Sequence, residues 1–275
     1  MNRITEALGW LAAALAAIAS AVGLLTASYR DTPAMVDQAR GADLATLLVA
    51  VPVLVVSLWR ARRGSPLADV AVAAGLAYIV YTYAIFAFQV VVNPLTPAHI
   101  AILGLAAWAL ALGMRDRVQA AAAAERTRLP RRTTAGFLAF LVVAFAGLWL
   151  SQIGQAIATG SLPEAVADLG VPTSAVYALD LAFVLPVFAI SAVRLLRGSA
   201  LGQPLAFGCL VFSVLMALSI LGLFAVQAAR GTLSDPSMSV VFAVISAAAA
   251  VLAALGARPT RIRLSAAASQ AKASS

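Results

Sequence analysis

The chain has 275 residues, 63% of them apolar, and a mean hydropathy of +0.96, whereas soluble globular proteins are roughly 45–50% apolar. This composition excludes a soluble globular protein and indicates a membrane protein. The formal net charge of +8 does not indicate a nucleic-acid partner, because the sequence has no soluble domain to bind one. The single cysteine, Cys209, excludes an intramolecular disulfide, and the single histidine, His99, excludes multi-histidine metal sites.

Eight apolar stretches along the chain are candidates to cross the bilayer, which takes about 20 apolar residues in a helix. The first could instead be a secretory signal. However, Glu6 lies in its basic region and the apolar run exceeds the usual core of roughly 7–15 residues, so we expect a retained span. The predicted fold class is an all-α, polytopic membrane helix bundle with spans at 7–27, 43–59, 68–92, 97–114, 134–158, 174–193, 201–227 and 237–257.

The basic residues predict the orientation of these spans. With the N-terminus inside, sixteen of the nineteen arginines and lysines lie in inner segments, and only Arg30, Arg40 and Arg230 lie outside. The positive-inside rule then places both termini in the cytoplasm. The inner arginine belt is expected to contact anionic lipid headgroups. Arginine greatly outnumbers lysine and alanine is abundant, which is typical of GC-rich bacterial genomes, so we predict a multi-pass protein of the bacterial plasma (inner) membrane.

A polar pattern in the second span recurs in the sixth span, with its proline, serine and arginines 134 positions later and its Asp-Leu-Ala 137 positions later. It predicts two related four-helix halves, 1–114 and 134–257, joined by a basic cytoplasmic linker at 115–133. A basic, then Ala/Ser-rich tail at 258–275 is expected to be disordered. Because both halves would begin inside, the repeats would be parallel, related by an axis along the membrane normal. The pattern is Asp43-Leu44-Ala45, Pro52, Ser57, Arg60 and Arg63-Gly64-Ser65, repeated as Asp180-Leu181-Ala182, Pro186, Ser191, Arg194 and Arg197-Gly198-Ser199.

Asp180 is the strongest candidate for a functional residue. It lies seven residues past Thr173, about 10 Å below the outer end of its span at about 1.5 Å per residue. A carboxylate at that depth is costly and often marks a functional site. Tyr177 shares its helix face, and Pro186 would loosen the helix nearby. Asp180 could bind a cation, shuttle a proton or accept a hydrogen bond from a substrate; the alternative is a structural hydrogen bond to a neighbouring helix.

The other candidate binding residues are Asp43, Tyr81, Gln152 and Gln155. Asp43 is interpreted first as a helix N-cap, although pseudo-symmetry could turn both aspartates toward a central axis. Tyr81 lies mid-membrane and its hydroxyl needs a partner, so it could line a cavity. Gln152 and Gln155 are one turn apart on one face, near Trp149. Polar side chains gather in the outer third of the spans, which predicts a polar vestibule open to the outside.

A further set of residues lies within 41–200: Gly41-Ala42-Asp43-Leu44, Thr46-Leu47, Pro52, Ala61-Arg62-Arg63-Gly64-Ser65, Tyr81-Thr82-Tyr83, Phe88, Asn93 and the Asp180-Leu181-Ala182-Phe183…Pro186 segment. Through these residues, most of 41–200 resembles a family of bacterial multi-pass integral membrane proteins with about eight spans and no assigned activity. The resemblance implies the fold class and no activity. Members often have glutamine where Ala42 stands and asparagine where Thr82 stands.

These features favour binding or transport of a small molecule, lipid or ion at an outward-facing site between the halves. Two alternatives stay open: an intramembrane enzyme that modifies a lipid or terpenoid with Asp180 as acid or base, and a scaffold without a ligand. Phosphate-binding glycine loops and metal-ligand spacings are absent from the sequence, so no cofactor and no metal are expected. The expected partners are membrane lipids and a small-molecule or lipid ligand.

Overall fold

Helices form the secondary structure of this computed structural model, which describes residues 3–124, 128–233 and 236–257. Eight helices in these ranges are long and apolar enough to cross a membrane, as the sequence predicts, and they suggest a multi-pass membrane protein. Within the same ranges there is no strand. The tail at 258–275 and residues 125–127 of the predicted linker lie outside the described residues.

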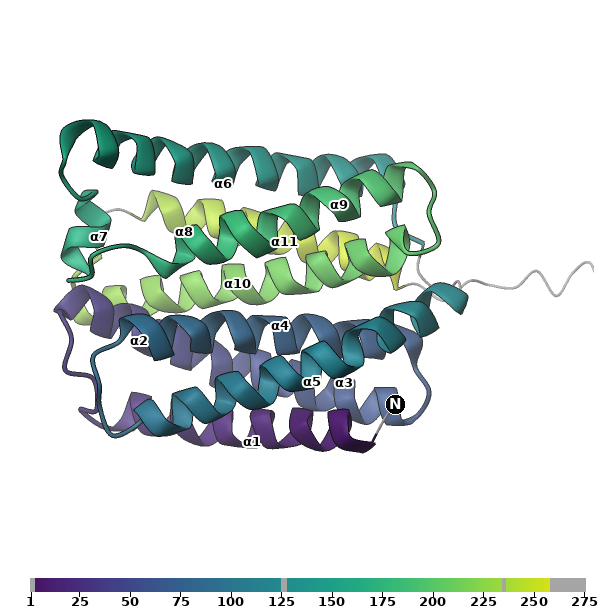
Figure 1. Ribbon diagram of the computed structural model, residues 1–275, viewed down its shortest axis with the longest axis horizontal. Coiled ribbons are helices and arrows are strands. Elements are labelled where there is room, and N and C mark those ends of the chain that lie inside the picture. Colours follow the sequence, from purple (N-terminus) through teal and green to yellow (C-terminus); the bar gives the residue numbers. More distant parts are fainter. Residues whose placement is uncertain (1–2, 125–127, 234–235, 258–275) are drawn as a thin grey trace, which may run out of the picture.

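Each half contains four of these long helices, and the second helix of each half is interrupted (Figure 1). The first half comprises α1 (Arg3–Leu25), α2 (Pro33–Ala45), η1 (Thr46–Ala50), α3 (Val51–Arg62), α4 (Pro66–Gln89) and α5 (Thr96–Ala123). The second half comprises α6 (Arg131–Thr159), the short α7 (Glu164–Asp168), α8 (Ala175–Leu179), η2 (Asp180–Val184), α9 (Leu185–Leu196), α10 (Gly202–Arg230) and α11 (Ser237–Gly256).

Two helices extend beyond the predicted spans by more than two turns. The second helix begins at Pro33 rather than at residue 43, because the Thr32 side chain accepts a hydrogen bond from Met35 N (3.3 Å) and proline suits the first turn. The charged residues of its first turns gave this segment the hydropathy of a loop. Similarly, α5 continues to Ala123 through part of the segment predicted as a linker, because its alanine-rich sequence favours a helix.

The interruptions η1 and η2 are π-helical turns placed identically before Pro52 and Pro186. A proline has no N–H to donate, so the helix ladder is broken one turn before it. In both copies a wider turn results: Val51 N donates to Thr46 O, and Leu185 N donates to Asp180 O. The loosening predicted near Pro186 is confirmed. The two π-helical turns are 134 positions apart, the same spacing as the sequence pattern.

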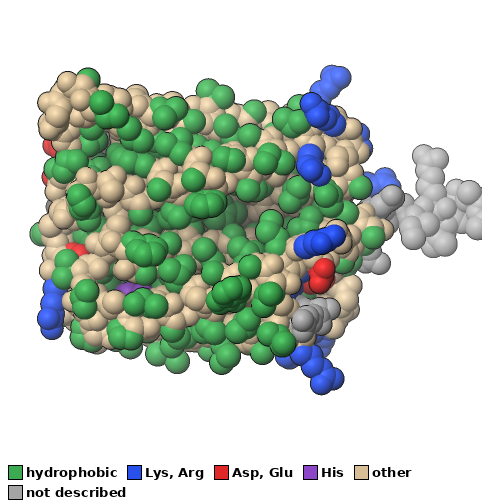
Figure 2. All heavy atoms as spheres, in the orientation of Figure 1, with side chains coloured by type: hydrophobic (Ala, Val, Ile, Leu, Met, Phe, Trp, Pro, Cys, Tyr) green, Lys and Arg blue, Asp and Glu red, His purple; other side chains and the backbone are tan. Residues whose placement is uncertain are grey.

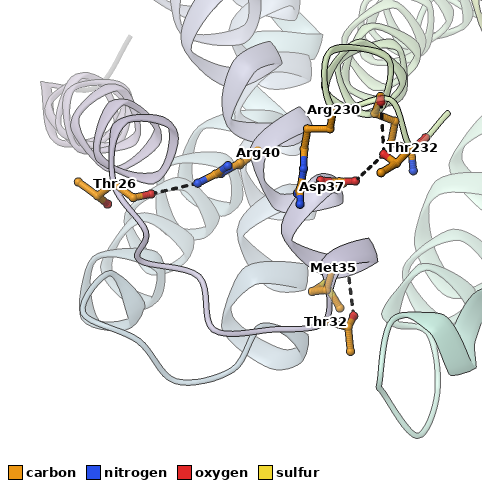
Figure 3. Close-up of polar contacts among 8 residues, drawn as sticks. Thr26, Thr32, Met35, Asp37, Arg40, Arg230 and Thr232 are labelled. Carbon is orange, nitrogen blue, oxygen red and sulfur yellow. Dashed lines mark hydrogen bonds and ion pairs between the residues drawn. The ribbon is translucent and has the colours of Figure 1, made fainter.

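Helix α10 lies at the centre and packs against α2 and α4 of the first half and against α9 and α11 of its own half. Its contact with α2 is backbone to backbone: a Cβ on Gly41 would lie 2.3 Å from Leu223 N and Cα. Beyond this contact, Asp37 of α2 forms an ion pair with Arg230 and accepts a hydrogen bond from Thr232 Oγ1 at 3.3 Å (Figure 3). The α2–α10 side of the interface between the halves is therefore closed.

Charged side chains divide the bundle into two unlike ends. Arginines gather at the end where α1 begins, which we call the basic end (Figure 2). Two carboxylates there are paired: Glu6 with Arg62, and Asp69 with Arg117 at 3.0 Å. Most other carboxylates lie on the half of the bundle nearest the opposite end, where α1 finishes and α2 begins. Asp180 belongs to this second group.

Candidate functional site

The carboxylate of Asp180 joins the two halves of the bundle. Tyr81 OH of α4 donates to Asp180 Oδ1 at 3.1 Å, and Trp149 Nε1 of α6 donates to Oδ2 at 2.8 Å. Asp180 is the first residue of η2, so the π-helical turn begins at this contact. Three helices, one from the first half and two from the second, therefore meet at one carboxylate. The predicted candidates Asp180 and Tyr81 lie together.

Two more predicted residues complete this arrangement. Tyr177 OH donates to Gln152 Oε1 at 2.7 Å, and the Tyr177 ring lies 5.5 Å from the Trp149 ring between centroids. We call Asp180, Tyr81, Trp149, Tyr177 and Gln152 the Asp180 cluster. Gln155 does not join it, because its side chain is exposed on α6. Of the two glutamines only Gln152 contacts this cluster, so a shared role for Gln152 and Gln155 stays a prediction.

Trp149 was not predicted as a partner of Asp180, although it was noted beside the glutamines. Its position three residues before Gln152 places both side chains on one face of α6, and that spacing was available in the sequence. An indole N–H inside a membrane needs an acceptor, and a carboxylate on the neighbouring span is the strongest acceptor at hand. An intramembrane tryptophan can thus mark the helix that faces a buried acid.

An apolar groove of about 370 Å³ lies next to the Asp180 cluster, between the two halves. Helices α4 and α5 line one wall, and α8, η2, α9 and α10 line the other. The groove is open to the side, since Phe183 in its wall is 66% exposed, and the surface is hollowed between the halves (Figure 2). Its lining includes Val70, Ala74, Ala77, Leu110, Met114, Val118, Val187, Gly208 and Cys209.

The groove runs from the middle of the bundle toward the basic end. Tyr81 and Phe212 pack edge to face near the Asp180 cluster, with ring centroids 6.0 Å apart. Along α4 the lining continues from Tyr81 to Val70, eleven residues or about 16 Å. A smaller pocket of about 240 Å³, also mainly apolar, lies on the other side of the cluster beside Tyr177 and Thr173. The larger cavity is therefore an apolar lateral groove and differs from the predicted polar vestibule.

Asp43 belongs to a separate, fully enclosed group in the first half. It lies ten residues after Pro33 and is 1% exposed, so the interpretation as an N-cap is wrong; Thr32 caps this helix. Tyr29 OH donates to Asp43 Oδ2 at 2.5 Å. Burial and the neighbouring Asp43 carboxylate raise the pKa of Tyr29, so the phenol stays a donor. Gly23 makes room for the pair, because a Cβ there would lie 2.1 Å from Asp43 Oδ2.

His99 packs near the same group, with its ring 4.7 Å from Phe86 and 6.5 Å from Tyr29 between centroids. It is 1% exposed and lies on α5, away from Asp180. Within the described parts of the chain, no group of three or more histidine, cysteine or carboxylate side chains is placed to hold a metal ion. The Asp43 group is thus a packed polar core, and the Asp180 cluster is the polar group that adjoins a cavity.

The chain matches no protein-family model, no curated protein and no solved structure in the comparisons made with each. The geometry of the Asp180 cluster and the groove therefore carries the functional argument.

Proposed function

We propose that the chain binds and transports a lipid or another apolar small molecule in the groove between its halves, with the Asp180 cluster closing the deep end. The observation that carries this proposal is the position of the Asp180 carboxylate, which bridges both halves where a laterally open apolar groove ends. A side-opening groove at membrane depth faces lipid chains, so an apolar occupant fits it. Its volume lies within the range of small-molecule sites, about 300–1,000 Å³.

The polar end of the groove can recognise a hydrogen-bond donor on the ligand. Asp180 Oδ1 accepts a hydrogen bond from Tyr81 and Oδ2 accepts one from Trp149, and each oxygen has capacity for a further one. A hydroxyl or amine group beside Tyr81 would be held there at low dielectric, where hydrogen bonds are strong. The same contacts tie α4 to η2 and α6, so ligand binding and the contact between the halves are linked.

The proposed orientation places the basic end and both termini in the cytoplasm of a bacterial plasma membrane. The gathering of arginines at that end supports this topology. The proposal also includes two parallel repeats of four helices. The matched π-helical turns η1 and η2, 134 positions apart, support this duplication, because an irregular turn at equal positions is rarer than shared hydrophobicity.

Photo-crosslinking tests lipid binding in the groove. The chain is placed in nanodiscs of phosphatidylcholine with a photoactivatable group on the acyl chain, and the labelled peptides are mapped by mass spectrometry. Ala77 lines the groove, so Ala77→Phe should fill it and reduce labelling of the groove peptides on α5 and α9. Ala139→Phe is the matched control, because Ala139 is exposed on α6 outside the groove.

The expected result is that the groove peptides are labelled more than the exposed face of α11, and that only Ala77→Phe removes this excess. Equal labelling of the groove and of α11 would contradict the proposal. So would an Ala77→Phe variant that folds and keeps the excess, because the labelled lipid would then lie elsewhere.

A further inference from the structure

Arginines lie at the end of the groove farthest from Asp180. The groove-lining Phe183 on η2 and Val187 on α9 are followed on the same helix face by Arg194 on α9 and by Arg197 just after it. The separations of 7 residues (Val187 to Arg194) and 14 residues (Phe183 to Arg197) are close to whole numbers of turns. Both arginines are exposed. Among the described residues neither has a salt-bridge partner. The apolar wall on α9 therefore continues into two free positive charges at the basic end.

A third arginine lies close to this pair. Arg131 begins α6, and its guanidinium is against the turn that follows α9, since a Cβ on Gly198 would lie 3.3 Å from Arg131 Nη1. On the opposite wall, Arg117 is paired with Asp69, and the exposed Arg115 is followed in the sequence by the exposed Asp116, so these positive and negative charges are equal in number. Basic side chains outnumber acidic ones at this end of the groove-bearing face (Figure 2). The free positive charge near the groove thus comes mainly from the second half.

We propose that the occupant of the groove is an anionic phospholipid, with an acyl chain between α5 and α9 and the phosphate on Arg194, Arg197 and Arg131. This inference rests on the proposed function and names its ligand class. Guanidinium groups bind phosphate oxygens through paired, charge-assisted hydrogen bonds. The arginines follow the last apolar turn of the groove wall, at the depth where a phospholipid changes from chain to headgroup.

The other half of the chain supplies a matched control. Arg60 and Arg63 stand 134 positions before Arg194 and Arg197, at the same end of the bundle and with the same charge. They lie on and just after α3, which contributes no residue to the groove lining, and the Arg63 guanidinium lies 3.6 Å from the centroid of the Trp59 ring. A general attraction of the arginine belt for anionic lipid would involve both pairs equally. A headgroup site would involve only Arg194 and Arg197.

The experiment uses the full chain in nanodiscs with equal amounts of phosphatidylglycerol and phosphatidylcholine, each with an acyl-chain photo-crosslinker of distinct mass. The measured quantity is the ratio of the two labels on the groove peptides. One basic residue near the surface favours anionic lipid by about five-fold. We expect a ratio above about five in the natural chain, a ratio at least about five-fold lower in R194Q/R197Q, in which only Arg131 remains, and no change in R60Q/R63Q.

A ratio near one in the natural chain would overturn the headgroup site and leave lipid binding in the groove intact. An equal loss of preference in both double variants would also overturn it, because the arginines would then act only as a belt. The proposed function itself would be contradicted if neither lipid labelled the groove peptides more than the peptides on the exposed face of α11. All four substitutions are at or near exposed helix ends, and circular dichroism of each variant verifies that it is folded.

Discussion

Replacing Asp180 by leucine should weaken the contact between the two halves beside the groove and so lower the free energy of unfolding. The substitution removes the acceptor of two interhelical hydrogen bonds, from Tyr81 OH and from Trp149 Nε1. Such bonds contribute about 0.6 kcal/mol on average and up to about 1.7 kcal/mol in membrane proteins. Two of them give a loss of about 1–3 kcal/mol in the free energy of unfolding.

Asp180→Asn should have a much smaller effect on stability. The side-chain oxygen of asparagine can accept from Trp149, which is only a donor, while its amide can donate to the Tyr81 hydroxyl, which can also accept. Both contacts survive, so we expect a loss below about 1 kcal/mol. Asparagine removes the negative charge and two acceptor sites, so it should weaken binding of a ligand whose hydroxyl or amine reaches Asp180. A phospholipid held through its phosphate by the distant arginines should bind unchanged.

The free energy of unfolding is measured by titrating sodium dodecyl sulfate into dodecyl maltoside micelles that contain each variant. Asp116→Leu is the control, because Asp116 is exposed on α5. A loss for Asp180→Leu that equals the losses for Asp180→Asn and Asp116→Leu would refute the reasoning. The carboxylate would then not hold the halves together.

Three further predictions concern the interface between the halves and the groove. Gly41→Ala should lower the free energy of unfolding by about 1–3 kcal/mol, because the added Cβ would meet the α10 backbone. Gly147→Ala is the control and should have no such effect, because no atom lies within 4 Å of a Cβ there. Equal effects of the two substitutions would contradict the α2–α10 contact. Cys209, the only cysteine, lines the groove, so its reaction rate with an apolar maleimide should fall as phospholipid is added to micelles; a rate independent of lipid would contradict a lipid-filled groove. Arg230→Gln should lower the free energy of unfolding more than Asp37→Asn in the same assay. The first substitution leaves the buried Asp37 carboxylate without its ion pair, whereas the second leaves only the half-exposed Arg230 guanidinium without its ion pair. The opposite order would contradict the proposed role of the ion pair.

The parts of the fold that the sequence predicted depend on local chemistry. Hydropathy over about 20 residues identifies each span, since the bilayer imposes that length. The π-helical turns before Pro52 and Pro186 follow from the missing N–H of proline, which acts within one turn. Asp180 and Tyr81 were identified because a polar group at membrane depth must find a partner. The hydrogen bond between them gives each polar group a partner and agrees with both interpretations of Asp180, a functional site and a structural bond to a neighbouring helix, so their role in binding stays a prediction.

The groove could not be predicted, because it arises where helices from opposite halves fail to meet. Its walls come from residues about 100 positions apart, such as Tyr81 and Phe183, and no local pattern relates them. The depth of Asp43 was misjudged for a different reason. The charged first turns of α2 resemble a loop in hydropathy, so the sequence pattern predicts a helix that begins at Asp43, whereas the helix begins at Pro33. Charge and helix are compatible where a helix end lies at a membrane surface.

The most direct test of lipid binding between the halves is an experimental structure of the chain in nanodiscs that contain phosphatidylglycerol. We expect elongated density between α5 and α9 that ends beside Tyr81, with Asp180 bonded to both Tyr81 and Trp149. A structure in which α5 and α9 pack against each other, with no density between them, would contradict a lipid site in this groove.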